Sequence, residues 1–310
     1  MIASSRPVQA GRVREVAVMI LNPTRCGSRV GITERGNKKM RVFKVAAIQT
    51  HTVIGDAEGN VAKGIEGLKE AAVQGAKVAC LPELFNTGYI IESHHLYSQS
   101  ESIDGPVINK LQKFAADNEM IIIAPIAERG DVTGVVYNTA VLIDEKGEVL
   151  GSARKNYRWG VEKLSYREGK GYPVFSTSVG KIGILICYDA EMPEPARLLA
   201  LQSAELVFVP SCWSKKGETR WDIQLPARAL DNLYFVVGVN IVGENNCGKS
   251  KIISPRGRVM AEASRENEAV LTTRIGLDEV VEARREIPYY TDFRPETFYK
   301  LDRGEQNDLY

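Results

Sequence analysis

Short apolar runs alternate with amphipathic stretches from residue 42 onward, and this alternation constrains the fold more than any other feature. Residues 57–74 and 106–118 carry apolar side chains at near-helical spacing, which predicts two helices. Strands alternating with helices predict an α/β fold, although periodicity leaves open whether the strands form one sheet or two. The runs expected to be strands are residues 45–49, 77–83, 120–126, 135–143, 174–176, 182–187, 206–210 and 235–241.

Cys187 ends one of these apolar runs, and a proline-marked helix start follows it. A thiol at this position lies beside the first free N–H groups of a helix, which favour its thiolate and can donate to a developing oxyanion. The position therefore predicts a nucleophile. The alternative is a core cysteine, because free cysteine is among the most buried residue types.

Two further strand ends carry ionisable residues. The run of residues 77–83 ends at Glu83, a carboxylate that is costly to bury unless it has a partner or a chemical role. Residues 140–143 and 148–155 flank a turn that contains glycine, which predicts a β-hairpin whose second strand delivers Lys155.

Glu83, Lys155 and Cys187, in this order, resemble the nitrilase superfamily of carbon–nitrogen hydrolases, whose catalytic triad is Glu-Lys-Cys. Glu162 falls where a subset of that family has a second glutamate. The resemblance covers most of residues 42–300 and implies a four-layer α-β-β-α sandwich in the amidase or N-carbamoyl amidohydrolase-like branch, with no cofactor and no metal. Other segments that match the family are residues 45–49, 81–83, 137–140, 186–189, 193–194 and 228–232, with Asn240 and Gly243.

Amide hydrolysis needs a nucleophile, a group for the oxyanion and a proton for the departing amine. Cys187 would attack the carbonyl carbon, and Glu83 would pass the thiol proton to the leaving ammonia. Lys155 and the backbone N–H of Tyr188 would stabilise the oxyanion, and the charge of Lys155 would lower the pKa of the thiol. Glu83 or Glu162 would activate water to hydrolyse the thioester, or Glu162 would chiefly hold Lys155 in place.

The Cys-Tyr-Asp sequence at the nucleophile resembles amidases and carbamoyl-amide hydrolases more than nitrilases. We therefore expect a small amide as substrate, with an N-carbamoyl amine or amino acid and then a nitrile as alternatives. Three aromatic residues are expected to line the pocket, although each could instead be a packing residue. They are Tyr89, Trp159 and Trp213, and either Arg158 or Arg220 could receive a substrate carboxylate.

Other mechanisms and function classes are disfavoured. None of the histidines, His51, His94 and His95, lies in a strand-end motif, so the sequence does not favour a Cys–His pair. Residues 243–250 match the P-loop pattern G-x-x-x-x-G-K-[ST], which is typical of nucleotide binding. A β-branched pair and a Pro–Gly turn follow Ser250, and proline would break the helix that a phosphate loop requires. A non-catalytic scaffold is disfavoured because all three triad residue types are present.

The chain has 310 residues and a formal net charge of +1, which predicts no nucleic-acid or membrane partner. Five cysteines without a CxxC motif predict a reducing compartment, the cytoplasm, and no zinc site. Residues 1–39 carry eight Lys and Arg against two acidic residues. We expect this segment to be a disordered leader upstream of a start at Met40, with a transit peptide as the alternative.

Residues 40–283 are expected to form the hydrolase domain and residues 284–310 a C-terminal arm. The arm begins with three aromatic residues among charges, a composition suited to covering another surface. The resemblance implies a homodimer or a higher homo-oligomer with the arm at its interface. The alternative is a tail folded onto its own body.

Overall fold

Two six-stranded sheets form the centre of the computed structural model, which describes residues 41–90 and 92–294. All of these residues belong to one unit that begins at Met40. The first sheet has the strand order β14 (Ala269–Gly276), β1 (Val42–Gln49), β2 (Ala76–Cys80), β3 (Ile121–Arg129), β4 (Val136–Ile143) and β5 (Val149–Arg154). The second has the order β13 (Val259–Glu262), β12 (Lys251–Ile253), β9 (Phe235–Val239), β8 (Leu206–Pro210), β7 (Lys181–Ile184) and β6 (Val174–Ser176).

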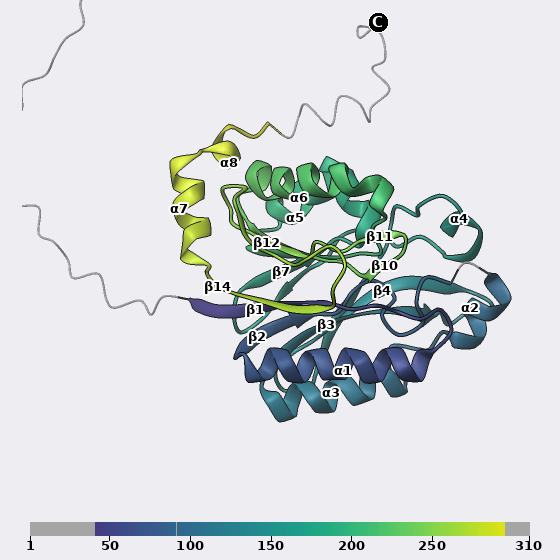
Figure 1. Cartoon of the computed structure of the whole chain (residues 1–310). Coiled ribbons are helices and arrows are strands. Elements are labelled where there is room, and N and C mark those ends of the chain that lie inside the picture. The colour runs from purple at the N-terminus through teal and green to yellow at the C-terminus, as the bar shows by residue number, and fades with distance from the viewer. Residues whose placement is uncertain (1–40, 91, 295–310) are drawn as a thin grey trace, which may run out of the picture. The chain divides into compact units, whose positions relative to one another are not determined.

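The sheets stack face to face between two layers of helices (Figure 1). Successive residues of β1 face opposite layers: Val45 packs against the second sheet, and Ala46 packs toward the outer helices. Both faces of the sheet are therefore buried, which explains why its strands are continuous apolar runs rather than alternating ones. The α/β class and the four-layer α-β-β-α arrangement expected from the resemblance are confirmed.

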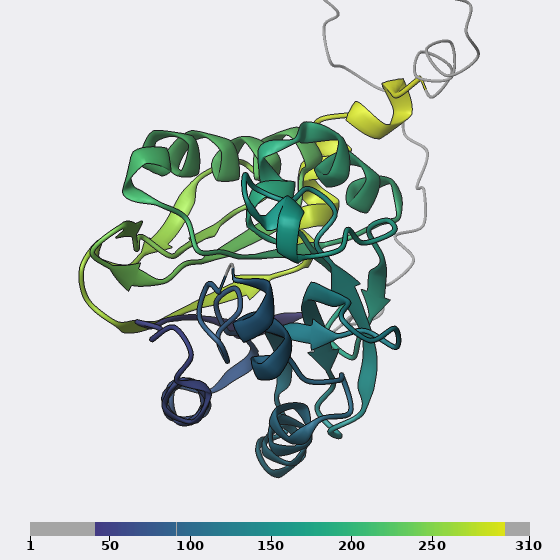
Figure 2. The same cartoon turned by 90° about the vertical axis from the view of Figure 1, so that its right-hand side faces the viewer.

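Helices cover the outer face of each sheet, as the view turned by 90° also shows (Figure 2). The first sheet packs against α1 (Ala57–Val73) and α3 (Pro106–Asn118), which are the two helices expected from the sequence. The second packs against α5 (Pro193–Leu201) and α6 (Glu218–Asn232). The shorter elements are α2 (Ser93–Gln99), α4 (Glu162–Ser165), the 3₁₀ helices η1 (Cys187–Glu191) and η2 (Lys215–Gly217), and the hairpin of β10 (Val242–Gly243) and β11 (Asn246–Cys247).

The sheet topology brings several strand ends to one region. Strand β2 runs parallel to β3, and β5 does so as well because it is antiparallel to β4, which is antiparallel to β3. In the second sheet β7, β8 and β9 are parallel to one another. Segments that leave the carboxyl ends of parallel strands emerge at one edge of a sheet, where ligand sites of α/β proteins are commonly built.

Two predicted strands end earlier in the structure. Strand β2 ends at Cys80 and β7 at Ile184, so Glu83 and Cys187 each lie three residues beyond a strand rather than at its last position. Periodicity could not find this boundary, because the residues that follow each strand are also apolar and buried.

The C-terminal part of the described chain folds onto its own body. Helix α7 (Asp278–Glu286) spans the predicted boundary at residue 284, and α8 (Tyr289–Asp292) follows it. The Tyr290 hydroxyl donates a hydrogen bond to the Asn232 carbonyl oxygen. The predicted leader and the rest of the predicted arm, residues 295–310, lie outside the described residues. Within the part of the chain that is described, no helix is long and apolar enough to cross a membrane.

Candidate active site

Three of the predicted site residues meet in a buried ionic cluster. Lys155 Nζ lies 2.7 Å from Glu83 Oε1 and 2.8 Å from Glu162 Oε1. The three side chains are at most 1% exposed. Lys155 reaches this position because it directly follows β5, whereas Glu83 follows β2 and Glu162 is the first residue of α4. One cation between two carboxylates compensates part of the cost of burying each charge.

Cys187 completes this group at the start of η1. Its backbone φ is 49°, in the left-handed region that residues other than glycine rarely adopt. Such conformations cost free energy and are often found at active sites. The residue as a whole is half-buried, unlike the fully buried Cys80.

The charges of the cluster determine the protonation state of Lys155. Burial alone would lower the pKa of its ammonium group. The negative charges of Glu83, Cys187 as a thiolate and Glu162, with the Glu162 hydrogen bond, outweigh burial and hold the pKa well above its usual value. Lys155 is therefore a permanent cation in the site and not a proton acceptor.

The pKa of the Cys187 thiol shifts opposite to the sequence expectation. Burial and the neighbouring Glu83 carboxylate raise it, whereas Lys155 and a hydrogen bond from the Cys212 N–H lower it. The net effect holds the pKa well above its usual value, so the prediction of a favoured thiolate is wrong. Burial and the second charge of the ion pair were not visible in the sequence. A thiol with a raised pKa needs a base that takes its proton during attack.

Glu83 has the hydrogen bonds that such a base needs for orientation. Its Oε1 accepts from Lys155 and from Asn138 Nδ2 at 2.8 Å, and its Oε2 accepts from the Cys212 N–H at 2.7 Å. Since this same N–H acts on the Cys187 sulfur, the Cys212 peptide links the carboxylate and the thiol. Asn138 lies on β4 and Cys212 follows β8.

Glu162 is saturated by three donors. Its Oε1 accepts from Lys155 and from the Tyr89 hydroxyl, and its Oε2 accepts from the Trp159 N–H at 2.8 Å. Burial, and then the charges of Glu162 and Glu83, raise the pKa of Tyr89, so this hydroxyl stays protonated and donates. Of the two roles considered for Glu162, this geometry favours holding Lys155 in place.

The three aromatic residues expected to line the pocket lie in different surroundings. Tyr89 contacts Glu162, as described above. Trp159 is 49% exposed and meets the Tyr188 ring edge-on at 4.9 Å between centroids. Trp213 is buried against Trp221, at 5.2 Å between centroids, and its indole N–H donates to the Gly217 carbonyl oxygen. Trp213 belongs to the core cluster on the outer face of the second sheet, which favours the packing alternative that the sequence left open for it.

Neither arginine considered for a substrate carboxylate is unpaired. Arg158 lies 2.9 Å from Glu168 and also donates to the Tyr166 carbonyl oxygen. Arg220 lies 2.9 Å from Glu191, with its guanidinium 5.8 Å from the Trp159 ring centroid.

The residues of the P-loop pattern serve the fold. Ser250 is fully buried and leads into β12, so a strand stands where a phosphate loop requires a helix. Lys249 Nζ pairs with Asp222 Oδ2, and Lys251 Nζ lies 2.6 Å from Asp222 Oδ1 and 2.7 Å from Glu262 Oε2. The lysine of the pattern is therefore part of an ionic network that joins α6 to β12 and β13.

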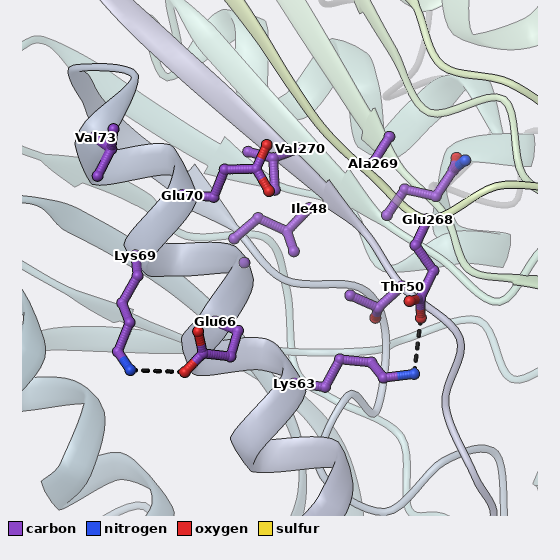
Figure 3. A pocket seen from close by; sticks show the side chains of 12 residues that line it. Ile48, Thr50, Lys63, Glu66, Lys69, Glu70, Val73, Glu268, Ala269 and Val270 are labelled. Atoms are coloured by element: carbon purple, nitrogen blue, oxygen red, sulfur yellow. Dashed lines mark hydrogen bonds and ion pairs between the residues drawn. The ribbon is translucent and has the colours of Figure 1, made fainter.

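A hollow with a volume of about 460 Å³ lies between α1 and the start of β14. Figure 3 shows the side chains that line it. Two ion pairs lie along it, Lys63 with Glu268 and Lys69 with Glu66. Glu83, Lys155, Glu162 and Cys187 do not line this hollow, so the hollow is separate from the candidate active site.

The histidines that can be placed do not join the cluster. His51 and His95 are exposed, and the His94 side chain lies outside the described residues. His95 Nε2 lies 3.8 Å from Glu92 on the surface. Among the described residues, no group of three or more His, Cys, Asp or Glu could hold a metal ion.

A buried Glu-Lys pair beside a cysteine, between two stacked sheets, defines a class of hydrolases. The family model for carbon–nitrogen hydrolases matches residues 44–285, and the chain belongs to this family within the nitrilase superfamily. It is accordingly a hydrolase that acts on carbon–nitrogen bonds.

Individual relatives match this chain in sequence, and solved structures match its fold. Nitrilase homolog 2 of Dictyostelium discoideum is 32% identical over 281 residues, which are 85% of this chain and 84% of that protein. Omega-amidase NIT2 of Homo sapiens is 27% identical over 84% of this chain and 98% of its own length. The crystal structure of an amidase from Nesterenkonia sp. matches with a TM-score of 0.69 and 27% identity, over 80% of this chain and 96% of that chain.

Sequence reasoning missed three residues of the site: Asn138, Cys212 and Asp189. Asn138 appeared only as part of a strand, although a lone amide in an otherwise apolar buried run is a signal that could have identified it. Cys212 has no signal in the sequence, because its contact with Glu83 joins residues 129 positions apart. Asp189 was noted only as part of the Cys-Tyr-Asp motif.

Proposed function

We propose that the chain is a cysteine-dependent amidase that cleaves a small, uncharged amide to an acid and ammonia through a thioester. The observation that carries this proposal is the hydrogen bonding of Glu83, which faces Lys155 on one oxygen and the Cys212 N–H, shared with Cys187, on the other. A base, a cation and a thiol are thereby assembled in one place. This chemistry needs no metal or cofactor, because the chain's own side chains supply every role.

Acylation begins with attack of the Cys187 sulfur on the amide carbon while Glu83 takes the thiol proton. Lys155 and the N–H of Tyr188 stabilise the oxyanion. The Tyr188 residue lies in the first turn of η1, where backbone N–H groups have no partner within the helix and can donate to a ligand. When the tetrahedral intermediate collapses, Glu83 gives its proton to the amine, and ammonia leaves. Water activated by Glu83 then hydrolyses the thioester and restores the thiol.

An uncharged amide fits the rim of the site better than an N-carbamoyl amino acid does. Recognition of a substrate carboxylate calls for a cation with free donors, and both candidate arginines already pair with glutamates. A relative supports small amides: a mutant of the Nesterenkonia amidase shows covalent addition of the acetamide moiety of fluoroacetamide at its active-site cysteine. N-carbamoyl compounds and nitriles remain the alternative substrates. We also propose that the protein forms a homo-oligomer and that it is located in the cytoplasm.

Ammonia release is the direct test. The chain is incubated with acetamide, butyramide, an N-carbamoyl amino acid and butyronitrile, with Cys187→Ala as the inactive control and Cys80→Ala as the matched control. We expect ammonia from the amides with both wild type and Cys80→Ala, and none with Cys187→Ala. Peptide mapping after fluoroacetamide treatment should find the adduct on Cys187. An adduct on Cys212 with Cys187 unmodified would overturn the assignment of the nucleophile.

A further inference from the structure

Asp189 lies two residues after the nucleophile, is 1% exposed, and makes four hydrogen bonds as an acceptor. Its Oδ1 accepts from the N–H groups of Asn156 at 3.2 Å and Tyr157 at 2.8 Å, and from the Tyr172 hydroxyl at 3.2 Å. Its Oδ2 accepts from the N–H of Ile186 at 3.3 Å. A buried carboxylate with this many donors is held in one orientation.

These donors flank two of the catalytic residues. Asn156 and Tyr157 directly follow Lys155, and Ile186 directly precedes Cys187. Lys155 belongs to the first sheet through its backbone, since its N–H donates to the Asn138 carbonyl oxygen, whereas Cys187 follows a strand of the second sheet. Among the hydrogen bonds of the described residues, those of Asp189 are the direct link between residues 155–157 and residues 186–189.

We propose that Asp189 is a positioning residue that holds Lys155 in register with Cys187 across the two sheets, and that protonation of its carboxylate loosens this link and slows attack of the thiol on the amide. The inference rests on the proposed amidase function. It adds a group that never touches the substrate, and whose charge state determines whether the oxyanion cation stands at the right distance from the nucleophile.

The surroundings of Asp189 place its titration near neutral pH. Burial raises its pKa to about 7, opposed first by the Tyr157 N–H, then by the Lys155 charge, the Ile186 N–H and the Tyr172 hydroxyl. The charged and titratable groups that face it are Lys155 and Tyr172. A protonated carboxyl needs an acceptor, but three of the four partners are N–H groups that can only donate. Only the Tyr172 hydroxyl can turn to accept, so protonation reverses that bond and weakens the others.

Tyr172→Phe tests the inference through the pH profile. The variant removes a donor that lowers the pKa of Asp189, so we expect the acid limb of kcat/KM to move to higher pH, while the rate on the plateau stays within about threefold. Tyr234→Phe is the matched control, since its buried hydroxyl bonds to the Ala196 carbonyl oxygen and does not contact Asp189. It should leave the limb in place. An unmoved limb in Tyr172→Phe would refute the proposed titration.

Asp189→Asn tests the link itself. The amide oxygen can still accept from residues 156 and 157, but its NH₂ group then faces the Ile186 N–H, donor against donor. We expect kcat to fall by about 10²-fold with KM changed only a few-fold, since a small misplacement of a catalytic group can cost this much. The acid limb assigned to Asp189 should disappear. Wild-type kcat with the limb retained would overturn the inference.

The positioning inference can be separated from the proposed function. If wild type releases no ammonia from any amide, the proposed function fails, and the rate of Cys187 alkylation by iodoacetamide becomes the readout. Asp189→Asn should slow this alkylation at neutral pH, because a less firmly held Lys155 lowers the thiol pKa less. Tyr172→Phe should shift the pH dependence of alkylation upward, because it raises the pH at which the carboxylate of Asp189 begins to hold residues 155–157. Urea unfolding of each variant shows whether it is folded. Alkylation rates equal to wild type in folded variants would refute the inference.

Discussion

The properties of each side chain in the candidate active site depend on where its neighbours place it. Lys155 is a cation because two carboxylates flank it, and Glu83 is a usable base because three donors fix its two oxygens. The Cys187 thiol is not reactive through a low pKa of its own, since burial and Glu83 raise that pKa. Reactivity therefore depends on proton transfer within the cluster and not on a resting thiolate.

Removal of the base or of the cation should slow acylation. We expect Glu83→Gln and Lys155→Ala each to lower kcat/KM by about 10²-fold or more, because each removes a group that acts in the transition state. Glu162→Gln should cost less, because it only helps to hold the lysine. Lys113→Ala, an exposed lysine of α3 paired with Asp117, is the control and should behave as wild type. Near-normal single-turnover rates in Glu83→Gln would show that another base is at work.

The raised pKa of Asp189 also affects stability. Its folded-state pKa of about 7 lies above the usual value near 3.8, so the folded protein binds this proton more tightly than the unfolded chain does. The contribution is fully present at pH below the unfolded value and is lost as the pH rises through 7. We expect the unfolding free energy of wild type, relative to Asp189→Asn, to decrease between pH 5 and pH 8 in urea titrations. A constant difference over this range would contradict the shift.

The strand-end positions of Glu83, Lys155 and Cys187 were visible in the sequence, and the resemblance to the nitrilase superfamily implied that the three act together. The sequence could not reveal Asp189 as a link or the raised thiol pKa. Both depend on contacts between segments that are far apart along the chain and on burial, which periodicity does not report. The sequence also left two positions open for Trp213, because a tryptophan beside a site and one beneath it have the same sequence neighbours.

At the scale of elements, α6 is anchored to the second sheet through charge. Lys251 on β12 is 2% exposed by side chain and pairs with Asp222 on α6 and with Glu262 on β13. The same carboxylate of α6 pairs with Lys249. The P-loop pattern in this region therefore reflects packing, and we expect no ATP binding that Lys249→Ala could remove.

Asp222→Asn should destabilise the fold more than the loss of a surface ion pair would. The variant leaves Lys251 buried with one carboxylate instead of two. Loss of the whole partner of a buried charge costs roughly 3–5 kcal/mol, and the remaining Glu262 should make the cost smaller here. Asp117→Asn, which removes an exposed pair with Lys113, should cost less than about 0.5 kcal/mol. Urea unfolding curves of the two variants measure the difference. Equal midpoints would mean that the network contributes no more than a surface pair.

On the scale of the whole molecule, the two ends of the chain are expected to differ in importance. A chain that starts at Met40 should hydrolyse amides like the full chain, since the family match begins at residue 44 and β1 at Val42. A chain that ends at Asp292 keeps the Tyr290 contact with the body, and we expect it to lose self-association if the remaining arm covers a second copy. Light scattering tests both. If the chain that starts at Met40 loses the oligomer, then residues 1–39, and not the C-terminal arm, are needed for assembly and the prediction is wrong.

Strand β1 pairs with β14 in antiparallel register from Val42 with Gly276 to Gln49 with Ala269. During synthesis, β1 leaves the ribosome long before β14 has been made. During that interval one edge of β1 has no strand to pair with, and exposed edges of this kind attract other chains. Contacts so distant along the chain also slow folding. Protection of β1 during synthesis by a chaperone that covers its free edge should therefore raise the yield of active enzyme more than a chaperone added after the chain is complete.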